Sequence, residues 1–142
     1  MVYNELLDIS ALKRALTAYE NMLKRALFVE KKPVETLEFY EFESVQAGLI
    51  QHFEFSFELS WKFMERYFIR EGMPSGMMRK QLFREAIKVG LIAGFEDWVK
   101  FNHARNRTSH TYDSVTAEAV YRIAKSYYPV FEAFVKTMES RI

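Results

Sequence analysis

The sequence predicts an all-α protein, an up-and-down antiparallel bundle of four or five helices in a single domain covering residues 1–142. Apolar residues recur at steps of three and four through most of the chain, which is the period of an amphipathic helix. Only residues 53–57 alternate as a strand would, and their neighbours on both sides are helical. The breaks between helical stretches are short and carry Gly or Pro, as expected in a bundle.

The first two helices are the longest. The first is expected near residues 9–31, where one apolar stripe runs until Pro33 stops it. The second has no breaker except Gly48 until Gly72, and we expect it to be the central helix. Its apolar residues at helical spacing are Val45, Leu49, Phe53, Phe57, Trp61, Met64 and Phe68.

Shorter helices should follow. Ser75 is the candidate N-cap of a third helix that Gly90 closes, and a fourth begins near Phe95. Asp or Ser at 113–114 can cap a last helix, which Pro129 is expected to kink.

Composition excludes several classes of protein. Zero cysteines exclude disulfides, Cys-ligated zinc and a thiol nucleophile. A net charge of +1 means that any contact with RNA must be a local patch, and no apolar run is long enough for a membrane span. No basic start with an apolar core resembles a signal peptide, so a soluble, cytoplasmic protein is expected. No cofactor is expected, and His52 and His103 lack the spacing of a metal site. The sequence has neither a Gly-rich phosphate-binding loop nor a D-x-D motif, so the chain is not expected to be a nucleotidyltransferase itself.

The most informative stretch is RNRTSHTYD at 105–113. Arg105 is a fixed cation that suits phosphate, and His110 can exchange a proton near neutral pH. Five residues turn a helix by about 140°, so the two side chains can converge only if the helix ends between them. Thr108 and Ser109 are poor helix formers and favour such a break. The alternative is structural: Arg105 pairs with an acid on the central helix, His110 caps a helix end, and Tyr112 packs with its hydroxyl at the surface.

The stretch FEFSFELSWK at 53–62 carries apolar residues on two sides of one helix. The second side either meets another subunit or is enclosed by the bundle itself; its residues are His52, Phe55, Leu59 and Lys62. Glu54 and Glu58 stand one turn apart, and we expect them to form salt bridges or to orient Arg105 rather than to act as a catalytic pair.

Together with REAIKVGLI at 84–92, these two stretches resemble the nucleotidyltransferase substrate-binding protein family, a branch of the HEPN superfamily. The resemblance covers roughly residues 8–138. It implies a helical bundle that forms a homodimer and is paired with a separate minimal nucleotidyltransferase, which would carry the metal site that this chain lacks.

HEPN toxins resemble the chain in their R-x4-H-x-Y pattern, which falls on Arg105, His110 and Tyr112. The resemblance implies metal-free RNA cleavage in which His110 is the acid or base, Arg105 stabilises charge on phosphorus and Asn106 positions the phosphate. It also implies that the partner enzyme attaches AMP to Tyr112 and thereby blocks the site. The family's name implies an alternative, a non-catalytic subunit that presents a small substrate to the partner.

Overall fold

The computed structural model describes residues 7–36 and 40–142, and in these ranges the regular structure is entirely helical. The all-α prediction is therefore confirmed. The helices are α1 (Ser10–Glu30), α2 (Glu41–Arg70), α3 (Arg79–Lys88), α4 (Phe95–Asn106), α5 (Ser114–Ser126) and α6 (Tyr128–Glu139), with short 3-10 turns η1 (Val34–Thr36) and η2 (Thr108–His110).

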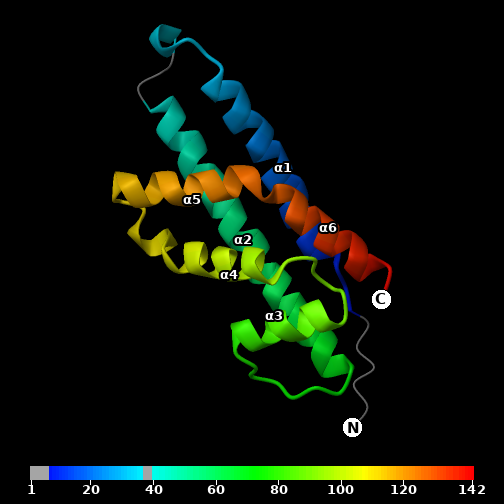
Figure 1. The fold of residues 1–142 in the computed structure, drawn as a ribbon. Coiled ribbons are helices and arrows are strands. Elements are labelled where there is room, and N and C mark those ends of the chain that lie inside the picture. Colours follow the sequence, from blue (N-terminus) through cyan, green and yellow to red (C-terminus); the bar gives the residue numbers. More distant parts are fainter. Residues whose placement is uncertain (1–6, 37–39) are drawn as a thin grey trace.

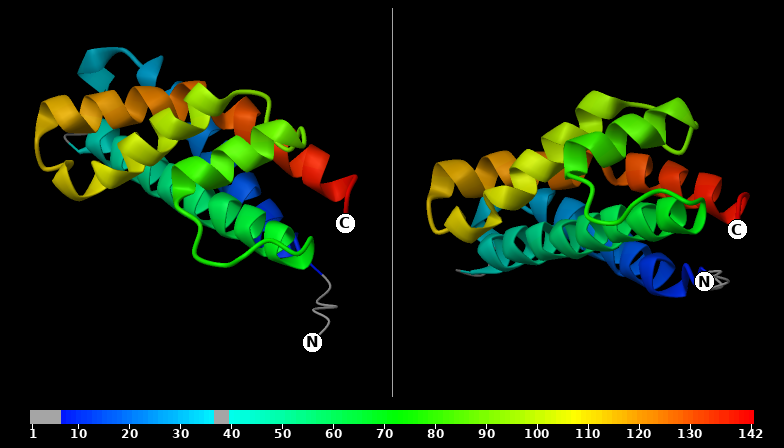
Figure 2. Two further views of the ribbon diagram at one scale, coloured as in Figure 1. Left: turned by 60° about the horizontal axis from the view of Figure 1, so that its bottom comes forward. Right: turned by 90° about the horizontal axis from the view of Figure 1, so that it is seen from below.

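Helices α1 and α2 form a long antiparallel hairpin, and α4 and α5 lie antiparallel to each other across it (Figure 1). The helices α3 to α6 lie on one side of this hairpin (Figure 2). Helix α2 has 30 residues, about 45 Å at 1.5 Å per residue, and contacts each of the other five helices. It is the central helix that the sequence predicts.

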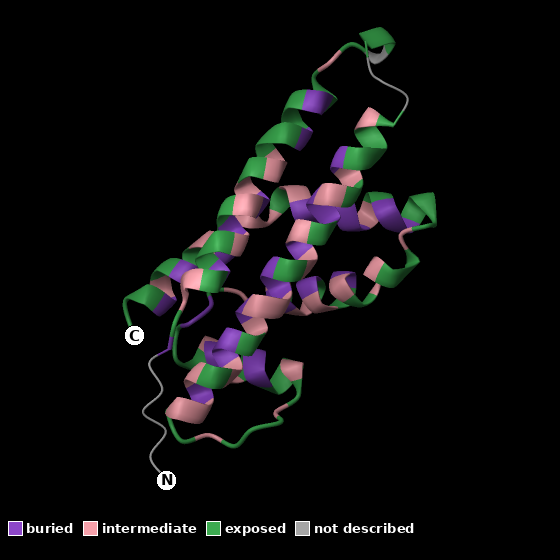
Figure 3. Ribbon diagram, turned by 180° about the vertical axis from the view of Figure 1, so that it is seen from behind, coloured by how far each residue is buried: buried purple, intermediate pink, exposed green. Residues whose placement is uncertain are grey.

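The core is aromatic and lies between α2 and the helices that cross it. Phe53 and Phe57 of α2 are fully buried, as are Trp98 and Phe101 of α4 and Phe131 of α6. The rings of Phe101 and Phe131 stack with their centroids 4.9 Å apart. The apolar stripe of α2 faces this core, so the opposite side of the helix faces away from it. Exposed and half-buried residues dominate the outer face of α1 and α2 (Figure 3).

A polar contact joins α1 to α5 beside the core. The Tyr121 hydroxyl donates to Oε1 of Glu30 at 2.7 Å, and Nζ of Lys125 donates to the same oxygen at 2.8 Å. Burial alone would raise the pKa of Glu30, but the hydrogen bonds from Lys125 and Tyr121 outweigh it and lower that pKa. The charged form of Glu30 is thus the one that the fold stabilises.

Two predictions about helix ends are wrong. Ser75 does not cap α3, because Gly76 takes a φ of +79° and the chain enters the helix only after Met78, whose side chain makes no cap. Pro129 does not kink a single last helix but follows a break at Tyr127, so two helices replace one and the chain has more than the four or five expected. Proline lacks an N–H and is accommodated in the first turn of α6, where no intrahelical donor is needed.

The second side of α2 is only partly covered. Phe55 is 49% exposed and Lys62 is exposed, whereas Leu59 is half-buried against the core. The small residues Ser56 and Ser60, not Phe55, are the fully buried ones on the remaining surface of the helix. The bundle therefore encloses part of α2 and leaves the Phe55 side open to solvent.

Candidate functional site

The RNRTSHTYD segment forms the connection between α4 and α5. Helix α4 ends at Asn106, and Thr108–His110 is the 3-10 turn η2. Asp113 then caps α5, since its carboxylate accepts from the backbone N–H of Val115 at 3.3 Å and from the hydroxyl of Thr116 at 3.0 Å. The predicted break at 108–109 and the predicted Asp113 cap are both confirmed.

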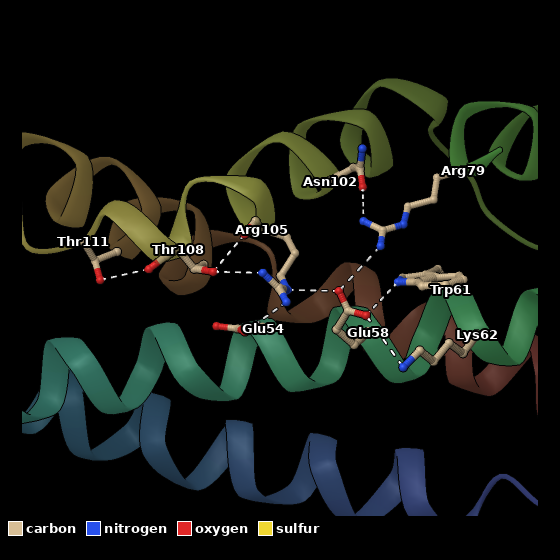
Figure 4. A network of polar contacts seen from close by, with 9 residues as sticks. All are labelled: Glu54, Glu58, Trp61, Lys62, Arg79, Asn102, Arg105, Thr108 and Thr111. Atoms are coloured by element: carbon tan, nitrogen blue, oxygen red, sulfur yellow. Dashed lines mark hydrogen bonds and ion pairs between the residues drawn. The ribbon is translucent and has the colours of Figure 1, made fainter.

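Arg105 does not point to solvent but reaches across to α2. Its NH2 lies 3.2 Å from Oε1 of Glu54, and its Nε lies 2.9 Å from Oε1 of Glu58. The Nε–H is not aligned with a hydrogen-bond acceptor, so the contact with Glu58 is an ion pair. NH1 donates to the hydroxyl of Thr108 at 3.1 Å, which itself donates to the backbone carbonyl of Arg105 at 2.8 Å (Figure 4). We call these four residues the arginine clamp.

Glu58 is the centre of a wider network in Figure 4. The indole N–H of Trp61 donates to its Oε2 at 3.2 Å, and Arg79 and Lys62 place cationic nitrogens 4.0 and 3.9 Å from its oxygens. Arg79 also lies over the Trp61 ring, 4.5 Å from its centroid, and donates to Oδ1 of Asn102 at 2.8 Å. The expectation that Glu54 and Glu58 orient Arg105 matches this geometry.

Sequence reasoning missed Arg79, Asn102 and Thr108. Asn102 could have been found, because it precedes Arg105 by three residues and so shares its helical face. Arg79 comes from the entrance to α3 and carries no spacing signal, since it meets Glu58 only through the tertiary fold.

His110 and Tyr112 form a second group on the outer side of the same connection. Both side chains are exposed, Tyr112 to 86%, and their rings meet edge to face with centroids 6.1 Å apart. Within the part of the chain that the structure describes, no hydrogen bond or ion pair joins Arg105 to His110. Of the structural alternative, the pairing of Arg105 with acids of α2 is therefore observed, whereas Tyr112 does not pack.

Asn106 lies on a different side from Arg105 and lines a groove of about 710 Å³ between α4 and α5. We call this the basic groove; its lining residues are Lys80, Glu96, Val99, Lys100, Asn102, His103, Ala104, Asn106, Arg107, Val120 and Ile123. His103 is exposed at this groove.

A second groove of about 610 Å³ lies between α2 and the start of α5, and Tyr112 lines it. We call it the acidic groove, because Glu43 and Glu54 are its charged residues; the rest of its lining is Gln46, Ala47, Ile50, Gln51, Thr108, Thr111, Tyr112, Ser114 and Ala117. The connection at 107–113 thus separates a basic groove from an acidic one.

In residues 7–36 and 40–142, no three side chains of His, Asp or Glu gather as metal ligands would. The same ranges contain no helix with the length and apolarity needed to cross a bilayer.

Comparison with known proteins places this geometry in context. Residues 7–140 match the model of the family described as "Nucleotidyltransferase substrate binding protein like". A "Probable ribonuclease HepT" from Haemophilus influenzae is 41% identical over 83 residues, which are 56% of this chain and 57% of that protein. The match therefore spans little more than half the length of this curated relative.

A solved structure from Haemophilus influenzae superimposes with a TM-score of 0.80 at 27% identity, covering 93% of this chain and 99% of that one. Its authors describe the fold of a substrate binding domain of a nucleotidyltransferase. The resemblance inferred from the sequence motifs is confirmed by the family match and agrees with both relatives.

Proposed function

The chain belongs to the nucleotidyltransferase substrate binding protein like family, and from this premise we propose that it is a metal-independent endoribonuclease that works beside a separate nucleotidyltransferase. The observation that carries the proposal is the placement of His110. It lies exposed on a turn that the arginine clamp ties to α2, so its imidazole is open to a ligand while its backbone is anchored. The name of the HepT relative supports the same activity.

The proposed reaction is an internal transfer at one RNA phosphate. His110 takes the proton of the ribose 2′-hydroxyl, whose oxygen then forms a bond to the adjacent phosphorus. The bond from phosphorus to the 5′-oxygen breaks, and that oxygen takes a proton from the imidazolium of a second His110 in a homodimer. The products are a 2′,3′-cyclic phosphate and a 5′-hydroxyl, so atoms and charge balance.

Arg105 can contribute although it is clamped. A guanidinium carries five N–H donors. One on NH1 donates to Thr108, while NH2 and Nε meet Glu54 and Glu58 as ion pairs, so within the described residues NH1 and NH2 keep N–H groups that no hydrogen bond uses. The side chain is 29% exposed, so these donors can meet phosphoryl oxygens as charge develops. Glu54 and Glu58 would then be positioning residues, and Asn106 would hold the phosphate from the side of the basic groove.

We expect the homodimer to form through the motif face. Two of the three most exposed large apolar side chains among the described residues lie there, Tyr112 at 86% and Val115 at 71%, and a second copy would cover them. Val115→Arg should then give a monomer in light scattering, whereas Phe55→Arg on the outer side of α2 should leave the dimer intact. The reverse result would move the interface to α2.

Control by the partner enzyme is proposed at Tyr112. Its hydroxyl oxygen would attack the α-phosphate of ATP, pyrophosphate would leave, and the attached AMP would add negative charge beside His110. In the free subunit Tyr112 is exposed and lines the acidic groove, so its hydroxyl is reachable from the α2 side before a second copy covers it.

One observation favours a second function. Glu54 and Glu58 together neutralise Arg105, as suits a structural arginine in a non-catalytic subunit that presents a small substrate to the nucleotidyltransferase. The description of the Haemophilus structure as a substrate binding domain agrees with that role.

An assay of RNA cleavage in the presence of a chelator distinguishes the ribonuclease from the substrate-presenting subunit. The ribonuclease should produce 2′,3′-cyclic phosphate ends, and His110→Ala or Arg105→Ala should abolish them while circular dichroism shows the helices retained. Arg14→Ala, an exposed cation of α1, serves as the matched control and should cleave normally. Wild-type protein that leaves RNA intact would refute the ribonuclease and favour the substrate-presenting subunit.

A further inference from the structure

We infer that the basic groove binds the RNA strand next to the cleaved bond, so that the chain holds several phosphates and not only the one that reacts. This inference rests on the proposed ribonuclease activity. It assigns an RNA-binding surface to α4 and the entrance of α3, outside the Arg105, His110 and Tyr112 motif.

The first argument is charge. Lys80, Lys100 and Arg107 line the groove, and within the described part of the chain none of the three makes an ion pair. Several cations elsewhere, Arg105 among them, are matched by carboxylates. Glu96 is the acid among the lining residues. In a chain of net charge +1, unpaired cations around one hollow are a local anion site.

These cations are also held in place. Nζ of Lys100 donates to the Tyr127 hydroxyl at 2.8 Å, and this hydrogen bond raises the pKa of Lys100. Arg107 is the C-cap residue of α4 and contacts the neutral hydroxyl of Thr116 at 3.5 Å. Both charges therefore remain available to phosphate while their stems are fixed by contacts with α5 and its end.

The second argument is continuity with the reactive segment. Asn106 and Arg107 directly follow Arg105 in the chain, and both line the groove. An RNA strand whose reacting phosphate lies at His110 can continue into either the acidic groove or the basic groove. The lining of the acidic groove carries Glu43, and also Glu54, whose charge is paired with Arg105. It offers no cation to further phosphates, whereas the basic groove offers three.

The third argument is the floor of the groove. Val99 and Ile123 supply partly exposed apolar surface above the buried Val120, and Asn102 and Asn106 are the amide residues of the lining. A cationic groove that follows the phosphates is one part of the pattern of single-strand binding, and here an apolar floor lies beside it for ribose and bases. The inferred ligand is therefore single-stranded RNA.

Binding of a labelled single-stranded RNA oligonucleotide, followed by fluorescence anisotropy across a range of salt, tests the inference. His110→Ala is the background, because it keeps the RNA intact. Adding Lys80→Gln and Lys100→Gln removes two phosphate contacts, so the slope of log K against log salt should fall by about 1.4, at about 0.7 per contact on a single strand. A rise in salt of about fourfold should then weaken the unchanged groove about sevenfold more than the altered one.

The matched control is Lys31→Gln with Lys136→Gln, which removes the same charge from exposed lysines outside the groove and should leave the slope unchanged. Lys80→Gln alone, at an exposed position, guards against a folding defect and should give half the effect. An unchanged slope in the double groove variant would overturn the inference, as would loss of binding to the nucleotidyltransferase with normal binding to RNA.

Cleavage distinguishes this inference from the proposed function. A dinucleotide has one phosphate, which the reaction holds at His110 and Asn106, and none for Lys80 or Lys100. The groove variant with His110 intact should therefore cleave it normally, while its KM for long RNA rises. If wild-type protein cleaves neither substrate, the ribonuclease proposal fails, and the salt slope still decides whether RNA occupies the groove. If both substrates lose cleavage equally, the groove acts in the chemistry and the inference is wrong.

Discussion

Replacing Glu58 by Gln tests the arginine clamp. The change keeps the shape of the side chain and its ability to accept from Trp61, but removes the charge that faces Arg105 at 2.9 Å and Arg79 at 4.0 Å. A partly exposed ion pair contributes up to about 1 kcal/mol, and Glu58 is 21% exposed, so removing these charge contacts should cost about 1 to 2 kcal/mol. For a chain of this size that lowers Tm by about 2 to 8 °C.

Thermal unfolding followed by circular dichroism measures this loss. Glu65→Gln is the matched control, because Glu65 lies on the same helix, is half-buried and makes no ion pair with the described residues. A double-mutant cycle with Arg105→Gln isolates the pair, and the coupling should shrink at about 1 M salt. If Glu58→Gln destabilises no more than Glu65→Gln, or shows no coupling to Arg105, the clamp does not hold the site as described.

Three further outcomes are expected. Phe101→Ala should lower the free energy of unfolding by about 3 to 5 kcal/mol in urea titrations, because the ring is fully buried; a loss under about 1 kcal/mol would contradict the core described above. Burial raises the pKa of Glu30, but hydrogen bonds from Lys125 and Tyr121 more than reverse this, so its carboxylate stabilises the fold above its ordinary pKa of 4.5. That stability is lost as pH falls through the lower folded pKa, and Glu30→Gln should therefore destabilise at pH 7 and converge with wild type as the pH falls below that pKa; a gap that does not narrow on acidification would refute the linkage. Incubation with the partner nucleotidyltransferase, ATP and magnesium should add AMP to the peptide containing Tyr112, which mass spectrometry would detect. Tyr112→Phe should prevent this modification. AMP found on a small molecule instead would support the substrate-presenting role.

The sequence predicts the fold well wherever apolar residues at helical spacing mark one face of a helix. The stripe of α2 is buried from Val45 to Phe68, and Trp61 is its half-buried member. Ser75 and Pro129 were assigned wrongly because each was judged from its type alone. The left-handed Gly76 and the break at Tyr127 decide those ends, and both depend on how the chain folds back on the core.

The candidate site is predictable in its parts but not in its arrangement. Spacing alone gives Glu54 and Glu58 one face, and weak helix formers give the break that follows Arg105. No spacing shows that Arg105 turns toward α2 while Asn106 turns toward the basic groove. These directions follow from where α4 lies against α2, and the two grooves likewise exist only once α5 has crossed the hairpin.

The alternation of residues along α2 has a consequence for how the protein opens. Glu54 directly follows Phe53 and Glu58 directly follows Phe57, so the acids of the clamp share their backbone with the aromatic core. Amide hydrogens of residues 53–58 should therefore exchange with solvent only through global unfolding, whereas those of residues 107–112 should exchange through local opening at much lower free energy. The reactive turn can thus fray and reclose many times while its anchor stays fixed.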